Sequence, residues 1–452
     1  MLLSERNDEL YRKKPKCWDF FRSLDLFLGS PKYVVAPMVD QSELAWRMLS
    51  RKYGAQLCYT PMLHAGLFAT QEEYRKKKFT TCSEDRPLIV QFCANDPQTL
   101  LKSARLVEDK VDAVDINLGC PKSIARKGRY GSFLMEDWNL IASLVSLLSQ
   151  QLRIPVTCKI RIFPDVEKTV CYAKMLEDSG CQLLTIHGRL REQQGQNAGF
   201  ADWNQIKAVR KALSIPIFAN GNILYLEDVH RCLQWTGVQG VMVAESNLYN
   251  PAIFTGIHFP ITKMAEEYLE LCENYSTHPS MIRSHLFKLW RKPLKIHSFM
   301  CEELGRANCL ENFRCLLNSF NLIYKEEQSE SLDLAGLHFS SEVIYLENAV
   351  LSRTKVISMW LCQPLVRLSA NESYTCLPES QQIFRRKVLE LRRQKKLAKR
   401  LKAKVCENYE LYVPQTNAGL EVVSIATLNP FYLSPCNKEE RATCAAALLP
   451  AE

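Results

Sequence analysis

Eight short apolar segments recur along the first half of the chain, and this recurrence constrains the fold more than any other feature. Each segment is followed by turn residues and then by apolar residues spaced three and four apart, which is typical of an amphipathic helix. Apolar strands joined by helices indicate a parallel sheet that is covered on both faces. The eight segments are 33–39, 57–63, 87–94, 113–119, 155–162, 183–189, 215–221 and 240–246.

Eight strand–helix units over about 215 residues favour an α/β fold of the TIM (β/α)8 barrel type, because such barrels typically need ~250 residues. A doubly wound open sheet is the alternative, and its first strand would be followed by a glycine-rich phosphate turn. The segment "APMVDQSE" that follows the first apolar run contains no glycine. We therefore expect the barrel.

The rest of the chain divides by pattern and composition. After the barrel, three stretches with helical spacing predict a small all-α domain, and its middle helix is basic through Lys288, Arg291, Lys292 and Lys295. The predicted parts are an N-terminal segment 1–30, a barrel 31–257, a helical domain 258–330, a linker 331–380 with a short "MWLCQP" anchor, a basic helix 381–405 and a tail 406–452 without a structural prediction.

The net charge of +9 is concentrated in one segment. Residues 385–404 contain eleven Lys and Arg and a single Glu, a net charge of +10, so the remainder of the chain is close to neutral. Such an arm would attract phosphate backbones without reading sequence. A solvated helix or a nuclear-import signal is the alternative interpretation.

Composition also excludes several classes of protein. The chain has no apolar run of 18 residues and its N-terminus is charged, so we expect neither a membrane span nor secretion. Its 18 cysteines are scattered through strand-like and helix-like segments, which favours a reducing compartment, cytoplasmic or nuclear. No cysteine pair has C-x-x-C spacing, so we expect no metal site.

Polar residues gather where the predicted strands end. Barrel enzymes place their chemistry at the carboxyl ends of the strands, so these side chains would converge on one pocket. The ends of the seventh and eighth strands commonly hold a phosphate on backbone N–H groups, which implies a phosphate-bearing cofactor. Lys159 would point to the barrel axis, where an ammonium can stabilise a reduced, anionic flavin. The strand-end residues are Pro37, Met38, Gln91, Asn117, Cys120, Lys159, Arg161, His187, Arg189, Asn220, Gly221, Ala244 and Glu245.

Cys120 follows the fourth strand in "NLGCPKSIARKGRYG". A nucleophile, a general acid and a small packed residue are all compatible with this position. We favour the general acid, because a thiol is mostly protonated at neutral pH and His187 is better placed for a phosphate than as a base for Cys120.

The motifs "APMVDQSELAWR", "VDINLGCPKSIARKGRYG", "VTCKIR", "IHGRLREQQGQNAG", "FANGNI" and "AESNLYNPAIF" resemble the tRNA-dihydrouridine synthases. The resemblance covers about residues 30–300 and is strongest to the eukaryotic type that acts on positions 16 and 17 of the D-loop. It implies an FMN-bearing barrel, a helical domain that supports the tRNA, and NADPH or NADH as the reductant.

By this resemblance each strand-end residue acquires a role. Cys120 would be the proton donor, and Asn117, Arg161 and Arg189 would bind the substrate. Glu245 cannot bind phosphate through its carboxylate, so its backbone N–H would serve there. The residues implied to bind FMN are Ala36, Pro37, Met38, Gln91, Lys159, His187, Asn220, Gly221, Asn222, Ala244 and Glu245.

The implied reaction adds hydride from FMN to C6 of uracil and a proton from Cys120 to C5. The target base must leave its stack to react, which is easier in a D-loop than in a duplex. Arg126, Lys127 and Arg129 would clamp neighbouring phosphates, or are solvated loop charges. We expect a monomer without membrane contact.

Two other functions remain open. An FMN oxidoreductase of a free pyrimidine would need neither the helical domain nor the basic arm and would turn over without RNA. A catalytically silent tRNA-binding barrel would be colourless yet still bind tRNA.

Overall fold

The computed structural model describes residues 31–195, 198–332 and 357–366. The predicted N-terminal segment 1–30, most of the linker 331–380, the basic helix 381–405 and the tail 406–452 lie outside the described residues. Within the described residues, every helix is too short or too polar to span a lipid bilayer.

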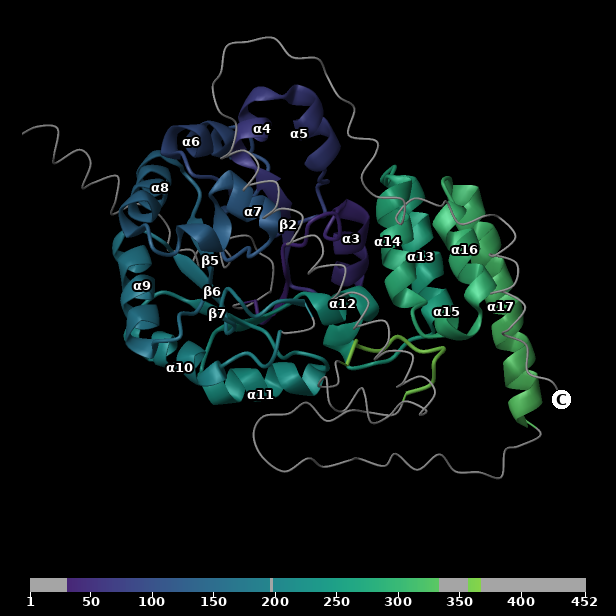
Figure 1. The fold of residues 1–452 in the computed structure, drawn as a ribbon. Helices are drawn as coiled ribbons and strands as arrows, with labels where there is room; N and C mark the ends of the chain where they lie inside the picture. The colour runs from purple at the N-terminus through teal and green to yellow at the C-terminus, as the bar shows by residue number, and fades with distance from the viewer. Residues whose placement is uncertain (1–30, 196–197, 333–356, 367–452) are drawn as a thin grey trace, which may run out of the picture. The chain divides into compact units, whose positions relative to one another are not determined.

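Eight parallel strands close into a barrel in sequential order, which confirms the predicted TIM fold (Figure 1). β1 pairs with both β2 and β8, so the sheet has no open edge. The strands are β1 Tyr33–Val35, β2 Leu57–His64, β3 Leu88–Cys93, β4 Ala113–Leu118, β5 Val156–Arg161, β6 Leu183–His187, β7 Ile217–Asn220 and β8 Gly240–Val243.

The first strand is shorter than the predicted 33–39, because Pro37 has no N–H to donate to the ladder.

Helices surround the barrel, and their starts follow local sequence signals. Asp96, Asp137, Asp165 and Asp202 each accept a backbone N–H at the start of a helix, the usual role of an N-cap aspartate. The helices of the barrel are α3 Leu44–Lys52, α4 Ala65–Thr70, α5 Glu72–Lys78, α6 Pro97–Arg105, α7 Ser123–Gly128, α8 Trp138–Gln151, α9 Val166–Asp178, α10 Trp203–Ala212, α11 Leu226–Thr236 and α12 Glu245–Tyr249.

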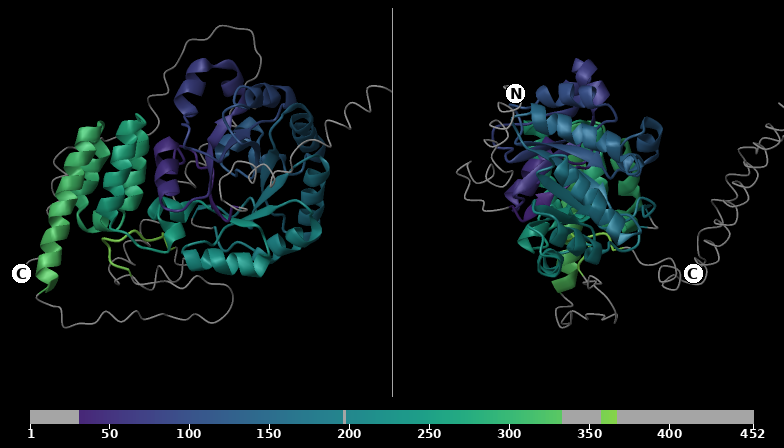
Figure 2. Two further views of the ribbon diagram at one scale, coloured as in Figure 1. Left: turned by 180° about the vertical axis from the view of Figure 1, so that it is seen from behind. Right: turned by 90° about the vertical axis from the view of Figure 1, so that its left-hand side faces the viewer.

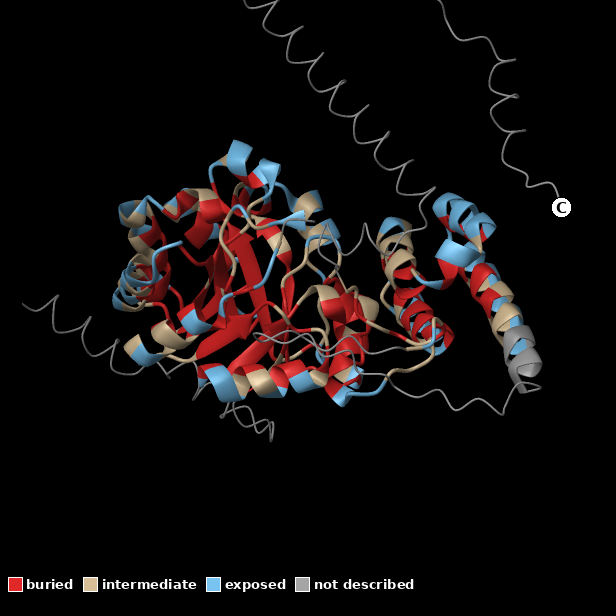
Figure 3. Ribbon diagram, turned by 60° about the horizontal axis from the view of Figure 1, so that its bottom comes forward, coloured by how far each residue is buried: buried red, intermediate tan, exposed pale blue. Residues whose placement is uncertain are grey.

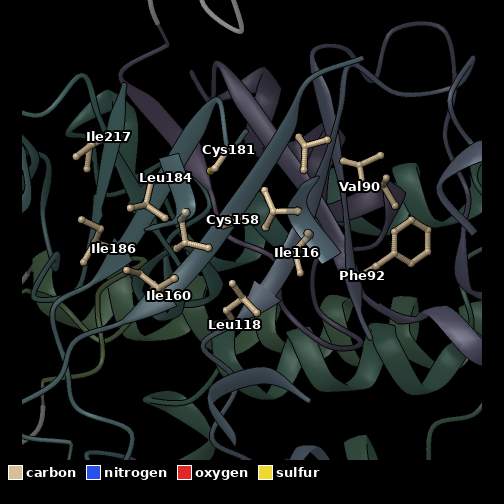
Figure 4. Packing of buried hydrophobic residues seen from close by; sticks show 14 of the residues in the cluster. Val90, Phe92, Ile116, Leu118, Cys158, Ile160, Cys181, Leu184, Ile186 and Ile217 are labelled. Atoms are coloured by element: carbon tan, nitrogen blue, oxygen red, sulfur yellow. The ribbon is translucent and has the colours of Figure 1, made fainter. Parts of the chain in front are cut away.

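Two apolar layers follow from the period-two alternation of the strands. The outward side chains of the strands pack against the helices. Figure 4 shows several of these side chains on neighbouring strands, among them Val90, Ile116 and Ile160. The inward side chains form a smaller cluster at the amino-terminal end of the barrel, including Ile89 and Phe218. Figure 3 shows the same arrangement by burial: the strands are buried and the outer faces of the helices are exposed.

A helical domain continues directly from the barrel and packs beside α3 (Figures 1 and 2). At this contact the ring of Trp46 stacks on His285 with centroids 3.9 Å apart. Glu43, just before α3, accepts hydrogen bonds from Tyr268 (2.6 Å) and His285 (3.0 Å). The helices are α13 Ile261–Asn274, α14 Pro279–Leu289, α15 Pro293–Ile296, α16 Ser298–Arg306 and α17 Leu310–Leu332.

Residues 357–366 contain the predicted "MWLCQP" anchor and pack against the helical domain. Leu361 forms an antiparallel bridge with Pro260, and Trp360 and Cys362 are buried in the core of the domain. The chain therefore returns to the barrel–bundle junction about 25 residues after α17 ends, a tertiary contact that burial of Trp360 stabilises.

Candidate active site

Alternation along the strands directs the polar strand-end residues into the barrel. In β4, Val114, Ile116 and Leu118 pack outward, so Asp115 and Asn117 face inward. The same alternation turns Thr157, Lys159 and Arg161 of β5 inward. These polar side chains form a layer on the carboxyl-terminal side of the inward apolar cluster that contains Ile89 and Phe218.

A buried chain of hydrogen bonds crosses three strands and ends at Cys120. The Asp115 carboxylate accepts from the Thr157 hydroxyl (2.6 Å) and from Nε2 of Gln91 (2.8 Å). Oε1 of Gln91 accepts from Nδ2 of Asn117 at 2.8 Å. Oδ1 of Asn117 accepts the backbone N–H groups of Gly119 (3.2 Å) and Cys120 (2.9 Å). This chain of hydrogen bonds fixes the backbone N–H of Cys120 from the interior of the barrel.

The loop after Cys120 holds the same residue from the other side. The carbonyl of Cys120 accepts from both the backbone N–H (3.1 Å) and the hydroxyl (3.0 Å) of Ser132. Gly131 has φ +66°, and a Cβ there would lie 2.8 Å from the Cys120 carbonyl oxygen, so only glycine allows this approach. The thiol is partly exposed on a backbone fixed at both ends.

Arg161 ties the Cys120 loop to the loop after β6. Its Nε donates to the carbonyl of Gly119 (3.0 Å), and its Nη1 donates to those of Leu190 (2.6 Å) and Gln193 (3.0 Å). Its side chain is only 7% exposed. Burial, then the nearby Arg189, lowers its pKa to about 10, so the guanidinium is charged at neutral pH.

Lys159 lies inside the barrel and donates to Oδ1 of Asn220 at 3.1 Å. Burial, reinforced by Arg161, lowers its pKa to about 8. The ammonium has three N–H donors and one is used by Asn220, which leaves donors for a ligand. The hydroxyl of Thr185, which is in register with Lys159, is buried without a hydrogen-bond partner among the described residues.

The ends of β6 and β7 form a second polar group. Nη1 of Arg189 lies 3.1 Å from Nε2 of His187, and Nη2 of Arg189 donates to Oδ1 of Asn222 at 3.0 Å. Gly221 (φ +114°) and Asn222 (φ +62°) are consecutive left-handed residues. Burial and the surrounding cations lower the pKa of His187 well below its usual value, so the imidazole is neutral.

Arg189 thus lies next to His187 and Asn222, and close enough to Arg161 to lower the pKa of that guanidinium. Its assignment as a substrate ligand together with Asn117 and Arg161 stays a prediction.

The remaining predicted residues line the β1 and β8 ends. The backbone N–H of Ala36 donates to the carbonyl of Val243 at 2.9 Å. Met38 packs against the inward apolar cluster of the barrel and against the helical domain. Pro37, Ala244 and Glu245 are partly exposed at the same rim. Among the described residues no three His, Cys, Asp or Glu side chains gather as a metal site.

Sequence reasoning missed Asp115 and Thr157, although both stand at inward positions. The available signal was an acidic residue inside an otherwise apolar strand, since buried aspartates are rare unless paired.

The basic residues after Cys120 are on the surface. Arg126, Lys127 and Arg129 are exposed, and the guanidinium of Arg126 lies 5.8 Å from the ring of Phe133. Arg191, from the loop after β6, lies 5.7 Å from the same ring. Cations from α7 and from the loop after β6 therefore flank Phe133 near Cys120.

Comparison with known proteins gives a consistent result. The dihydrouridine synthase family matches residues 34–331. A rat protein named tRNA-dihydrouridine(16/17) synthase [NAD(P)(+)]-like is 50% identical over 347 residues, 76% of each chain. The Saccharomyces cerevisiae tRNA-dihydrouridine(16/17) synthase [NAD(P)(+)] is 46% identical and is covered over 84% of its length. A human tRNA-dihydrouridine(20a/20b) synthase-like protein is 37% identical over 262 residues. With this match across both the barrel and the helical domain, the chain belongs to the dihydrouridine synthase family.

Proposed function

We propose that this protein reduces uridine in tRNA to 5,6-dihydrouridine, with FMN as cofactor, NADPH or NADH as reductant and Cys120 as proton donor. The observation that carries the proposal is Cys120 itself, a partly exposed residue whose backbone is fixed at N–H and carbonyl, next to the buried guanidinium of Arg161. Identity to the 16/17-type relatives supports positions 16 and 17 of the D-loop as the targets.

The residues at the rim fit a flavin mononucleotide. Lys159 has spare N–H donors inside the barrel, and the buried Thr185 hydroxyl has no partner among the described residues. Arg189 and the left-handed pair Gly221–Asn222 present cationic and backbone donors suited to a phosphate. We therefore assign Arg189 to the phosphate side together with His187.

Other residues complete the cofactor site in this proposal. Ala36, Pro37 and Met38 would contact the ring system, Gln91 would hydrogen-bond it, and Asn220, Ala244 and Glu245 would border it through side-chain amide or backbone groups. When bound, FMN reduced by the nicotinamide nucleotide supplies the hydride that adds to C6 of uracil.

The protein's own task is then proton delivery. Addition at C6 generates an enolate through the C4 carbonyl, and the thiol proton of Cys120 moves to C5 to complete the 5,6-dihydro base. Asn117, whose side chain already orients the Cys120 backbone, would border the uracil, and Arg161 would hold the loop that carries the thiol. Each turnover leaves a thiolate that takes its next proton from solvent.

Cations outside the barrel support a tRNA partner. A hollow between α14 and residues 357–366 is lined by Lys288, Arg291 and Lys292. The charge of Arg291, then burial and the charge of Lys292, lower the pKa of Lys295, so the positive charges of this helix end repel one another. A phosphate backbone would relieve this repulsion. Arg126, Lys127 and Arg129 would clamp phosphates near the target base.

Every described cysteine is a free thiol, which supports residence in a reducing compartment, cytoplasmic or nuclear.

The test is an anaerobic visible spectrum of the purified protein, followed by NADPH and then by unmodified tRNA. Flavin bands that bleach with NADPH and return only when tRNA is added support the proposal. Return with free uracil would favour an oxidoreductase of a free pyrimidine, and a colourless protein that binds tRNA would favour a silent tRNA-binding barrel.

A further inference from the structure

The hydrogen-bond chain beneath Cys120 has a direction. Asp115 stands at its start, is fully buried, and as a carboxylate can only accept. Gln91 and Asn117 each carry an amide with one accepting and one donating end, and either end can point either way. The partners alone decide the orientation.

The Asp115 carboxylate determines the orientation of both amides, Gln91 and Asn117. Because Asp115 accepts, Gln91 must turn Nε2 toward it at 2.8 Å, which leaves Oε1 facing Asn117. Asn117 must then donate with Nδ2 and present Oδ1 to the N–H groups of Gly119 and Cys120. In the reverse orientation Nδ2 of Asn117 would face those two N–H groups, and both hydrogen bonds would be lost.

We propose that Asp115 is a positioning residue, which orients the amides of Gln91 and Asn117 and thereby holds the Cys120 thiol in place for proton transfer. The inference rests on the proposed function of Cys120. It adds a residue that touches neither substrate nor cofactor.

The surroundings keep Asp115 in the accepting form at neutral pH. Burial raises its pKa to about 6, while the hydrogen bonds from Thr157 and Gln91 and the charge of Lys159 act in the opposite direction. The groups that face it are Thr157 and Lys159 from β5 and the uncharged Gln91 from β3. The thiol of Cys158 lies on the outer face of β5, where the charge of Asp115 contributes to its raised pKa. A counter-ion for Lys159 is therefore the rival role, and the experiment must separate the two.

Three substitutions separate these roles. Asp115→Leu keeps the branched shape and removes the acceptor. Asp115→Asn keeps an acceptor oxygen for Gln91, because its amino group can donate to the Thr157 hydroxyl, but removes the charge. Thr157→Val is the matched control, since it removes the other hydrogen bond to the same carboxylate and leaves the chain to Cys120 intact.

The measurement is single-turnover reoxidation of the NADPH-reduced protein by unmodified tRNA, as a function of tRNA concentration. We expect Asp115→Leu to lower the limiting rate at least about tenfold, with the half-saturating tRNA concentration within about twofold, because loss of position affects the proton transfer and not RNA binding. Asp115→Asn and Thr157→Val should stay within about threefold of the wild type, since the chain keeps its direction.

Several outcomes would overturn the inference. Wild-type rates in Asp115→Leu would remove any positioning role. An Asp115→Asn variant as slow as Asp115→Leu would assign the effect to charge beside Lys159, and an equally slow Thr157→Val variant would assign it to general packing. Asp115→Ala is the second variant if Asp115→Leu loses its flavin, and loss of flavin from both would make the carboxylate a folding requirement.

A second readout does not depend on tRNA. The alkylation rate of Cys120 by iodoacetamide, followed by mass spectrometry, should change in Asp115→Leu and not in Asp115→Asn. Suppose that tRNA does not reoxidise the reduced wild-type protein but the alkylation rate is altered in Asp115→Leu. The positioning role would then stand, and only the proposed function would be refuted. An unaltered rate would refute the positioning role.

Discussion

Arg161 offers the sharpest test of how the barrel holds the Cys120 loop. Its guanidinium donates to three backbone carbonyls, those of Gly119, Leu190 and Gln193, and thereby joins the loops after β4 and β6. Arg161→Met keeps much of the side-chain volume and leaves those carbonyls without this donor. Each lost hydrogen bond costs about 1 kcal/mol net of the bonds that water re-forms with the carbonyl. The two loops should therefore lose about 3 kcal/mol of local stability.

The assay is native-state hydrogen exchange. A loss of about 3 kcal/mol corresponds to roughly a hundredfold faster exchange in residues 119–134 and 189–193, with little change in the outer helices. Arg191→Met is the matched control, because Arg191 is partly exposed and pairs only with Glu192 among the described acidic residues, a contact that contributes about 0–1 kcal/mol. Unchanged exchange in both loops, or an equal increase throughout the barrel, would refute this account of Arg161.

Four further predictions address the site and the basic arm. Cys120→Ala should keep its flavin and its oxidation of NADPH but lose most uridine reduction, and equal dihydrouridine yields by mass spectrometry would exclude the acid role. Because the pKa of Lys159 is lowered to about 8, its ammonium is present below that pH and lost above it, so flavin retention should fall as pH rises through about 8 and Lys159→Arg should flatten that loss in a spectrophotometric titration. The raised pKa of Asp115, about 6, makes its charged form a cost in the folded state, so the unfolding free energy should fall by about 2 kcal/mol between pH 4 and 7; the difference between wild type and Asp115→Asn in urea titrations should follow this curve, and a constant difference would contradict it. Deletion of residues 385–404 should weaken tRNA binding and make its salt dependence shallower without changing flavin content, whereas an unchanged salt slope would assign the arm to localisation or assembly.

Residues on the strands were predictable and contacts between strands were not. The period-two pattern of β4 and β5 indicates which side chains face inward, so Asn117, Lys159 and Arg161 could be placed at one rim from sequence. Asp115 was overlooked because its partners, Gln91 and Thr157, belong to the neighbouring strands. The strand register pairs Gln91 with Asp115 and Asp115 with Thr157, and no local pattern carries that information.

Arg189 shows that contacts within a single motif also depend on the tertiary structure. In "IHGR" it lies two residues from His187, and sequence assigned the two to different ligands. The backbone after β6 brings their side chains to 3.1 Å, and Asn222 from the next strand end holds the guanidinium there.

The eight strands, their order and the position of Cys120 after the fourth could be predicted from the sequence, because hydrophobic period and turn chemistry are local properties of the chain. The motif residues also sufficed to indicate the family. The pairing of donors with acceptors depends on the folded chain: the directed chain from Asp115 to Cys120, the Arg161 link between two loops and the return of residues 357–366 to Pro260. These contacts join residues far apart in sequence, and their geometry exists only once barrel closure has set the strand register.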